Sequence, residues 1–339
     1  MRSILWKIAA LAITICAHPG AAVAQSGEGP AFTRNLQIVV SFGSGGGYDL
    51  WARAVARHMG QYLAGKPAIV VQNMPGAGGY TAANYVYNLA PKDGSVIGLV
   101  AREAPLGPLT GADGARFDST KFGWIGTPTI ETSVCIVNAS ARAKIRRDAQ
   151  GEPLVFGDTG SGSGTFAYAR GHAALLDFRM RFVSGFPSTS DIFLAMERKE
   201  VDGVCEGVDS IVSRRPDWIA ARKVEVLSQS GRERRHEMAD VPTVYELAKS
   251  DDARKALAFI YAGQDIGRPF IAPPDLAPGR LGQLREAFEA TMKTPAFVAD
   301  AAAQKLPVEP KTGVELEQMI RDLYATPQAV LKRAAEIIK

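Results

Sequence analysis

Cysteine is scarce in this chain of 339 residues, which contains three. Cys16 lies in the N-terminal segment, so only Cys135 and Cys205 remain for the rest of the chain. Neither has a cysteine or histidine at the short spacing of zinc ligands, which argues against a zinc site. Two cysteines in an oxidising compartment either form a disulfide or stay as buried thiols, and the sequence leaves both alternatives open.

Histidine and net charge are also low. Beyond the N-terminal segment the histidines are His58, His172 and His236, and none lies in a glycine-rich loop. We therefore expect none of them to act as a catalytic base. The formal net charge is only +4, with no long basic run, so we expect no nucleic-acid partner.

Long apolar runs are missing after the first 24 residues, where nothing approaches the roughly 20 residues that span a bilayer. Before that point, Arg2 and Lys7 precede a short apolar stretch, which ends near Ala22-Val23-Ala24. This pattern predicts a signal peptide over 1–24, cleaved after Ala24, with an uncleaved anchor as the alternative. The mature protein should then be exported and periplasmic, and it should begin at Gln25.

Three common catalytic motifs are absent. A G-x-G-x-x-G motif starting at Gly43 fails because Tyr48 replaces the third glycine. Neither early glycine loop ends in the Gly-Lys-Ser/Thr of a P-loop, and no serine stands in G-x-S-x-G. We therefore expect no catalytic residues, no bound metal and no cofactor.

The stretch 36–58 combines a short apolar run, a glycine turn and a helical pattern. Ile38–Val40 is β-branched and reads as a buried strand, and Gly43–Gly47 follow it with little side-chain bulk. Leu50, Ala54 and Met59 then recur at helical spacing, and Asp49 is placed to cap that helix. A strand, a glycine turn and a helix N-terminus together form an anion-binding arrangement.

The same alternation of strands and helices recurs to the end of the chain, with a loop-like stretch at 117–126. It predicts an α/β fold of mostly parallel sheets flanked by helices, arranged in two lobes. We expect the first lobe over 25–130 and 229–339 and the second over 131–228. We expect further strands near 68–72, 96–100, 131–137, 154–157, 180–183, 201–206 and 224–228, and helices near 80–89, 166–176, 189–198, 245–249, 254–262, 281–293, 295–304 and 313–338.

Three loops rich in Gly, Ser and Thr, at 43–49, 75–81 and 158–165, follow strands. Ligands in such sheets bind beyond the carboxyl ends of the strands, so the loops should face one cleft. Arg102 and Glu103 follow another strand. Arg102 would clamp a carboxylate and Glu103 would take an amine, or both are solvated charges on the rim.

Four stretches resemble one family: IVVSFGSGGGYDLWARAVARHM, VVQNMPGAGGYTAANYV, FGDTGSGSGT and SGRERRHEMADVPTVYE. They are similar to the solute receptors of tripartite tricarboxylate transporters, the Bug proteins, along nearly the whole mature chain. The resemblance implies a two-lobed type II periplasmic binding protein that binds small carboxylates. Ser184-Gly185-Phe186-Pro187 departs from the usual family pattern, and Asp158 is an unexpected neighbour for an anion.

The predicted function is therefore a monomeric, non-enzymatic periplasmic receptor that delivers a small carboxylate to integral membrane transporter subunits. The alternatives are a receptor that feeds a membrane sensor and a cleft enzyme. In the receptor topology the strands of Cys135 and Cys205 are antiparallel neighbours, which permits a bridge without requiring one. The expected ligand-binding residues are Phe42, Gly43, Ser44, Gly45, Gly46, Gly47, Asp49, Gly76, Ala77, Gly78, Gly79, Tyr80, Arg102, Thr159, Ser161, Gly162, Ser163 and Thr165.

Overall fold

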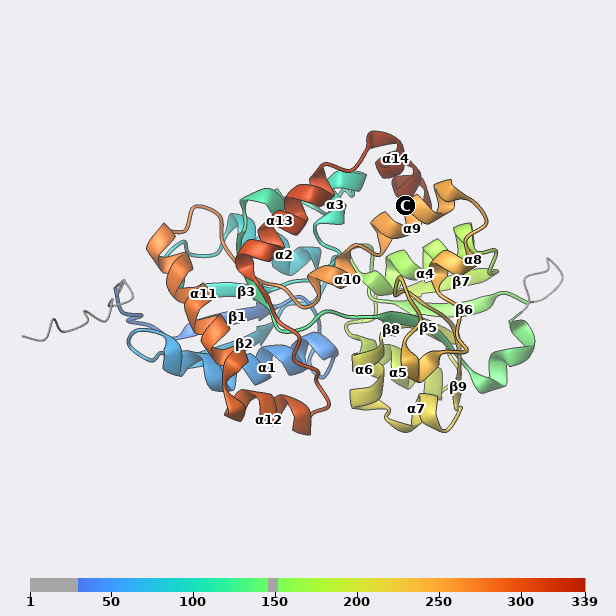
Figure 1. The fold of residues 1–339 in the computed structure, drawn as a ribbon, viewed down its shortest axis with the longest axis horizontal. Coiled ribbons are helices and arrows are strands. Elements are labelled where there is room, and N and C mark those ends of the chain that lie inside the picture. Colours follow the sequence, from blue (N-terminus) through green and yellow to red (C-terminus); the bar gives the residue numbers. More distant parts are fainter. Residues whose placement is uncertain (1–29, 146–151, 339) are drawn as a thin grey trace, which may run out of the picture.

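Two separate β-sheets organise the chain, and helices pack against both (Figure 1). The computed structural model describes residues 30–145 and 152–338, so the predicted signal peptide over 1–24 lies outside the described residues. The first sheet has the strand order β11-β4-β10-β3-β1-β2, and the second has the order β7-β6-β8-β5-β9. We call the halves built on these sheets the first lobe and the second lobe. The predicted α/β fold in two lobes is confirmed.

The first sheet has a parallel part on one side and an antiparallel part on the other. Its strands are β1 (Leu36–Val40), β2 (Ile69–Asn73), β3 (Val96–Leu99), β4 (Gly123–Thr127), β10 (Phe270–Ala272) and β11 (Lys311–Thr312). Strands β2 and β3 both pair in parallel with β1, whereas β10 and β11 pair antiparallel with their neighbours. Ile38, Val39 and Val40 are all fully buried, because helices cover both faces of this sheet.

The second sheet is mixed. Its strands are β5 (Ser133–Asn138), β6 (Leu154–Asp158), β7 (Met180–Ser184), β8 (Gly203–Gly207) and β9 (Val224–Gln229). Strand β6 pairs in parallel with β7 and β8, and β5 runs antiparallel between β8 and β9. Along β5 the side chains alternate between two cores: Val134 and Ile136 pack on one face, and Cys135 and Val137 on the other.

Cys135 and Cys205 lie directly opposite each other in β5 and β8, with their Cα atoms 3.9 Å apart. Their sulfur atoms form a disulfide, so of the two alternatives left open by the sequence the structure shows the bridge.

Helices cover the sheets and also connect the lobes. Those around the first sheet are α1 (Gly47–Met59), α2 (Tyr80–Asn88), α11 (Pro278–Lys293), α12 (Pro295–Ala303) and α13 (Gly313–Tyr324). Those around the second are α4 (Gly164–Leu175), α5 (Thr189–Glu197), α6 (Val208–Arg214), α7 (Asp217–Ala220), α8 (Val244–Leu247), α9 (Asp251–Ile260) and α14 (Gln328–Ile337). Between the lobes lie α3 (Leu106–Thr110) and α10 (Gly263–Ile266). Short 3₁₀ helices occur at Gly60–Tyr62, Ala77–Gly79, Ser119–Lys121, Ala139–Lys144 and His236–Met238.

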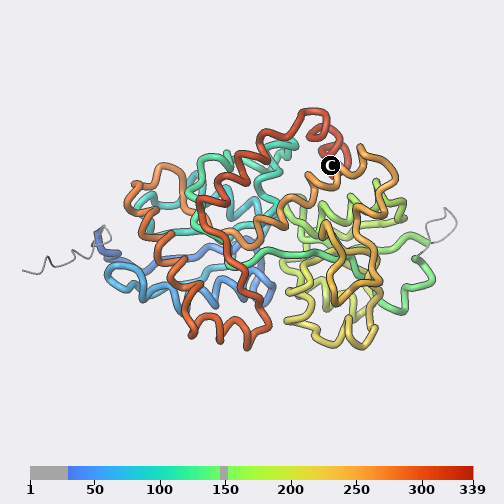
Figure 2. The backbone as a smooth tube through the Cα atoms, in the orientation of Figure 1, coloured from blue at the N-terminus to red at the C-terminus, as the bar shows by residue number. Residues whose placement is uncertain are grey.

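The chain crosses between the lobes at different points from those expected. Residues 229–339 were predicted to belong to the first lobe, but α9 and α14 pack in a core of the second lobe. The physical reason is the apolar face of α9, where Ala256, Leu257 and Ile260 are buried in that core. The chain therefore returns to the first lobe through α10, and the C-terminal helix reaches back over the second lobe (Figure 2).

Two further expectations differ from the structure. The segment 117–126 was expected to be a loop, yet it contains the start of β4. The single helix expected over 313–338 is broken into α13 and α14 at Pro327, which has no amide hydrogen to donate. No helix in the described ranges is long and apolar enough to cross a membrane.

Candidate functional site

The first glycine loop connects β1 to the N-terminus of α1. Gly45 has a φ of +83°, which favours glycine, and its N–H donates to Asp49 Oδ2 at 2.9 Å. Burial raises the pKa of Asp49, but hydrogen bonds from Arg53, the Gly45 N–H and Asn73 outweigh it and hold that pKa below its usual value. Asp49 thus stabilises the loop from within.

The second glycine loop contacts the third, across the gap between the lobes. Gly162 N–H donates to the carbonyl of Ala77 at 3.3 Å. A Cβ on Gly78 would lie 2.3 Å from Gly162 N and 2.4 Å from Gly160 O, so no side chain fits at Gly78 in this arrangement. The glycines of this loop therefore permit close backbone contact between the lobes.

The third loop leads from β6 into α4. Ser163 is the N-cap of α4 and accepts a hydrogen bond from Phe166 N–H. Its hydroxyl, together with those of Thr159 and Thr165, forms a connected set with Oγ distances of 2.9 and 3.0 Å. Asp158 accepts hydrogen bonds from Gly160 N–H and Ser184 Oγ, and it forms an ion pair with Arg170. The charge of Asp158 is therefore compensated within the second lobe.

Hydrogen bonds join the first loop to the second lobe as well. Gly43 N–H donates to Pro187 O at 2.9 Å, Ser190 Oγ donates to Gly45 O at 2.8 Å, and Arg214 Nη2 donates to Gly46 O at 3.1 Å. The two lobes are therefore closed on each other at the glycine loops.

A cavity of about 20 Å³ remains between the loops. Six of the expected ligand-binding residues line it, namely Phe42, Gly46, Gly47, Thr159, Ser163 and Thr165. Five lining residues were not predicted, namely Tyr48, Gly164, Thr189, Glu206 and Arg268. Twelve expected residues lie outside the lining, namely Gly43, Ser44, Gly45, Asp49, Gly76, Ala77, Gly78, Gly79, Tyr80, Arg102, Ser161 and Gly162. Many of these twelve contribute instead to the contacts between the loops.

Buried charges surround this cavity. Arg102 and Glu103 are 3% and 4% exposed, so the alternative that they are solvated rim charges is wrong. Arg102 Nε donates to Glu103 Oε1 at 2.7 Å, and Nη1 of the same guanidinium pairs with Glu131. Tyr168 of the second lobe donates its hydroxyl hydrogen to Glu103. Burial raises the pKa of Tyr168, and the neighbouring Glu103 raises it further, so this tyrosine is a neutral donor.

Arg268, between α10 and β10, completes the cluster. Its Nη2 pairs with Glu131, donates to Ser210 Oγ at 2.8 Å and lies 3.6 Å from Glu206 Oε1. Its guanidinium also stacks over the ring of Tyr48, at 4.0 Å from the ring centroid. We call Arg102, Glu103, Glu131, Glu206 and Arg268 the charge cluster.

The histidines and cysteines serve other roles. His172 contacts Tyr168 O at 2.9 Å and Ser228 Oγ at 2.5 Å inside the second lobe. Within the described residues, the group of potential metal ligands is His172 with Cys135 and Cys205, and the disulfide occupies both sulfur atoms. That group therefore does not form a metal site while the disulfide is intact.

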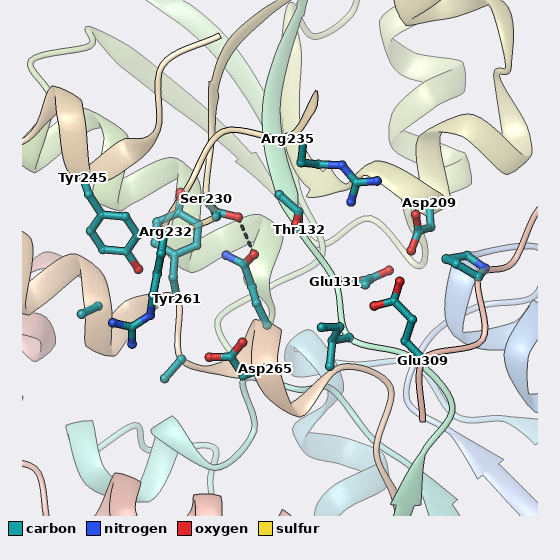
Figure 3. A pocket seen from close by; sticks show the side chains of 16 residues that line it. Glu131, Thr132, Asp209, Ser230, Arg232, Arg235, Tyr245, Tyr261, Asp265 and Glu309 are labelled. Atoms are coloured by element: carbon teal, nitrogen blue, oxygen red, sulfur yellow. Dashed lines mark hydrogen bonds between the residues drawn. The ribbon is translucent and has the colours of Figure 1, made fainter. Parts of the chain in front are cut away.

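A larger cavity of about 390 Å³ lies where the chain passes between the lobes (Figure 3). Thr132 and Ser230 lie near its middle, with Arg232 and Tyr245 on one side and Asp209 on the other. Burial raises the pKa of the Asp209 carboxyl. None of the glycine-loop residues lines this cavity, so we regard the smaller cavity between the loops as the candidate site.

Comparisons with known proteins establish the fold. No protein-family model and no curated protein sequence matches the chain. Among solved structures, MatC from Rhodopseudomonas palustris with bound malate has 18% identity and a TM-score of 0.67, covering 91% of this chain and 99% of that chain. The periplasmic binding protein BugD has 19% identity and a TM-score of 0.69, covering 90% and 98%. A second R. palustris protein, solved with adipate, has 16% identity and a TM-score of 0.67, covering 90% and 98%.

BugD is a periplasmic binding protein, and a further similar structure, from Polaromonas, is a TctC solute binding protein with 16% identity and a TM-score of 0.57, covering 89% of this chain and 99% of that chain. The chain therefore has the two-lobed fold of these periplasmic binding proteins, as the resemblance of its glycine loops implied.

Proposed function

We propose that the protein is a periplasmic receptor that binds a small organic carboxylate between its lobes and delivers it to a tripartite tricarboxylate-type transporter. One observation carries this proposal. Glycine-rich loops from both lobes end at the N-termini of α1 and α4, and these loops face each other across the cavity of about 20 Å³. The positive ends of both helices thus converge on one place.

The energetics of such a site are sufficient for a receptor. Hydrogen bonds to a charged group contribute about 1.5–3 kcal/mol each, whereas micromolar affinity requires about 8 kcal/mol. Several donors in a closed cleft reach that value without a dedicated side-chain clamp. Because both lobes supply groups to the cavity, a ligand that touches both stabilises the closed form.

The proteins of the same fold support the ligand class. MatC was solved with malate, and the second R. palustris protein was solved with adipate. Both ligands are small carboxylates. The predicted signal peptide over 1–24 agrees with a periplasmic location, and we propose that the mature receptor is a monomer that starts at Gln25.

The test is to identify what the protein binds. The mature protein is purified without added solute, denatured, and the released small molecules are identified by mass spectrometry. The stripped protein is then titrated calorimetrically with mono-, di- and tricarboxylates and with amino acids, which also carry a carboxylate. We expect micromolar or tighter binding of at least one member, and absence of binding across the whole panel would refute the carboxylate assignment.

A further inference from the structure

Two charged side chains of opposite sign line the cavity between the lobes. Arg268 is 1% exposed and Glu206 is 6% exposed, so both are buried beside the place where we propose that the ligand binds. Burying a charge is costly unless the charge is paired. A buried charge beside the cavity that lacks a full set of partners therefore indicates which group of a ligand it would bind.

Arg268 lines the cavity and does not use its full set of donors. Its Nη2 contacts the charge cluster and Ser210, but its buried Nε has no hydrogen-bond partner among the described residues. The guanidinium also lies against the start of α1, because a Cβ on Gly47 would be 3.0 Å from Nη2. A guanidinium beside a helix N-terminus forms a site for a carboxylate.

Glu206 retains acceptor capacity. Its Oε1 accepts a hydrogen bond from Gly207 N–H at 2.7 Å and lies 3.6 Å from Arg268 Nη2. Within the part of the chain that the structure describes, Oε2 of Glu206 accepts no hydrogen bond. Oε2 is also absent from the fully buried polar atoms that lack a partner, and an unpaired carboxylate oxygen beside a cavity is suited to an ammonium group.

The charge of the whole cluster favours a ligand with a positive group. Within the cluster three glutamates share two arginines, and Glu206 has the longest of these contacts, 3.6 Å from Oε1 to Arg268 Nη2. Glu103 also lies against the first turn of α4, because a Cβ on Gly164 would be 2.5 Å from Glu103 Oε1. The chain's own carboxylate is therefore already close to this helix N-terminus. A purely anionic ligand would add to the negative charge, whereas an ammonium group would offset it.

We propose that the ligand is zwitterionic, with a carboxylate held by Arg268 beside the N-terminus of α1 and an ammonium group held by Glu206. The class of ligand is an amino acid or a related aminocarboxylate. This inference rests on the proposed receptor function and names the ligand class more narrowly.

The experiment compares ligand pairs that differ only in the ammonium group. The stripped mature protein is titrated calorimetrically with succinate and aspartate, glutarate and glutamate, and propionate and alanine. For the pair that the protein binds, we expect the amino member to bind at least tenfold more tightly. In Glu206→Gln this advantage should fall to less than twofold, because the neutral amide no longer attracts the ammonium group. Glu200→Gln, which removes an exposed carboxylate, is the matched control and should keep the wild-type advantage.

Each outcome distinguishes the two proposals. Tighter binding of the deaminated acids would overturn the zwitterion inference and leave the receptor function standing. An amino advantage that persists unchanged in Glu206→Gln would also overturn the inference, because another group would hold the ammonium. No binding of any acid would overturn the proposed function and the inference with it. If thermal melting shows that Glu206→Gln does not fold, Glu206→Asp replaces it: we expect the displaced carboxylate to reduce the advantage, and an unreduced advantage would overturn the inference.

Discussion

We expect replacement of Gly47 by alanine to hinder closure of the lobes and to leave the first lobe folded. Gly47 is the first residue of α1 and does not have a positive φ, so alanine suits its backbone. The new Cβ would lie 2.3 Å from Ser210 Oγ and 3.0 Å from Arg268 Nη2. Ser210 belongs to α6 in the second lobe, so the methyl group opposes the closed arrangement.

The size of the effect follows from these distances. Carbon and oxygen atoms that are not bonded rarely approach closer than 3 Å, so the lobes or the Ser210 hydroxyl must move by on the order of 1 Å. Overpacking of this kind costs about 1–3 kcal/mol. Because a ligand binds to the closed form, we expect ligand affinity to fall about ten- to a hundredfold.

Calorimetric titration with the ligand released from the wild-type protein measures this loss, and thermal melting of the free protein checks that the fold is intact. Ser210→Ala removes the clashing oxygen, so the double variant with Gly47→Ala should recover most of the affinity lost by Gly47→Ala alone. Gly282→Ala, on α11 with no atom within 4 Å of the new Cβ, is the matched control and should bind normally. Wild-type affinity in a folded Gly47→Ala variant would refute the idea that the lobes close on Gly47.

Three further predictions concern stability. The mature protein should show no reactive thiol under denaturing, non-reducing conditions, and replacing Cys135 and Cys205 by alanine should lower the unfolding free energy by about 2–4 kcal/mol in urea titrations. Arg102→Met leaves two buried glutamates without this partner and should cost about 3–5 kcal/mol by the same measurement, whereas a loss below 1 kcal/mol would contradict the buried ion pairs. The lowered pKa of Asp49 implies stability that is present above its unfolded pKa of about 4 and is lost as pH falls. Asp49→Asn should therefore show a weaker decrease in stability between pH 5 and pH 3 (about one unit on either side of that value), and an unchanged slope would refute this assignment.

Local sequence patterns were enough to predict the secondary structure where a strand, a glycine turn and a helix follow one another. The run Ile38–Val40 became β1, and the apolar spacing after the loop became α1. Strand β4 was missed because Gly123 and Gly126 interrupt its apolar pattern. Strand β10 was missed because three residues carry no periodicity, and its place between β3 and β4 comes from tertiary pairing.

Two of the three predicted loops line the candidate cavity, whereas Glu206 and Arg268, which also line it, were not predicted. Arg268 follows a short helix and reaches the cavity only because α10 returns the chain to the first lobe. Glu206 carried a usable signal, because it lies near the carboxyl end of β8, where α/β sheets bind ligands. Asp158 and Arg102 carried the same signal, yet Asp158 is neutralised within the second lobe. Position at a strand end therefore identifies candidate residues, and the ion pairs in the structure indicate which of them remain available to a ligand.

The charge cluster is divided between the lobes, and this division determines which of its contacts are lost when the cleft opens. Arg102 and Glu103 are adjacent on the first lobe, so their ion pair is retained when the lobes separate. The bond from Tyr168 to Glu103 and the approach of Arg268 to Glu206 join different lobes, so both are lost on opening. Glu206 then becomes hydrated, and hydration of a carboxylate offsets much of the lost attraction. Closure must dehydrate Glu206 again, and a ligand that supplies a positive partner lowers that cost. Opening therefore hydrates Glu206, closing dehydrates it again, and the charge of the ligand affects how much closing costs.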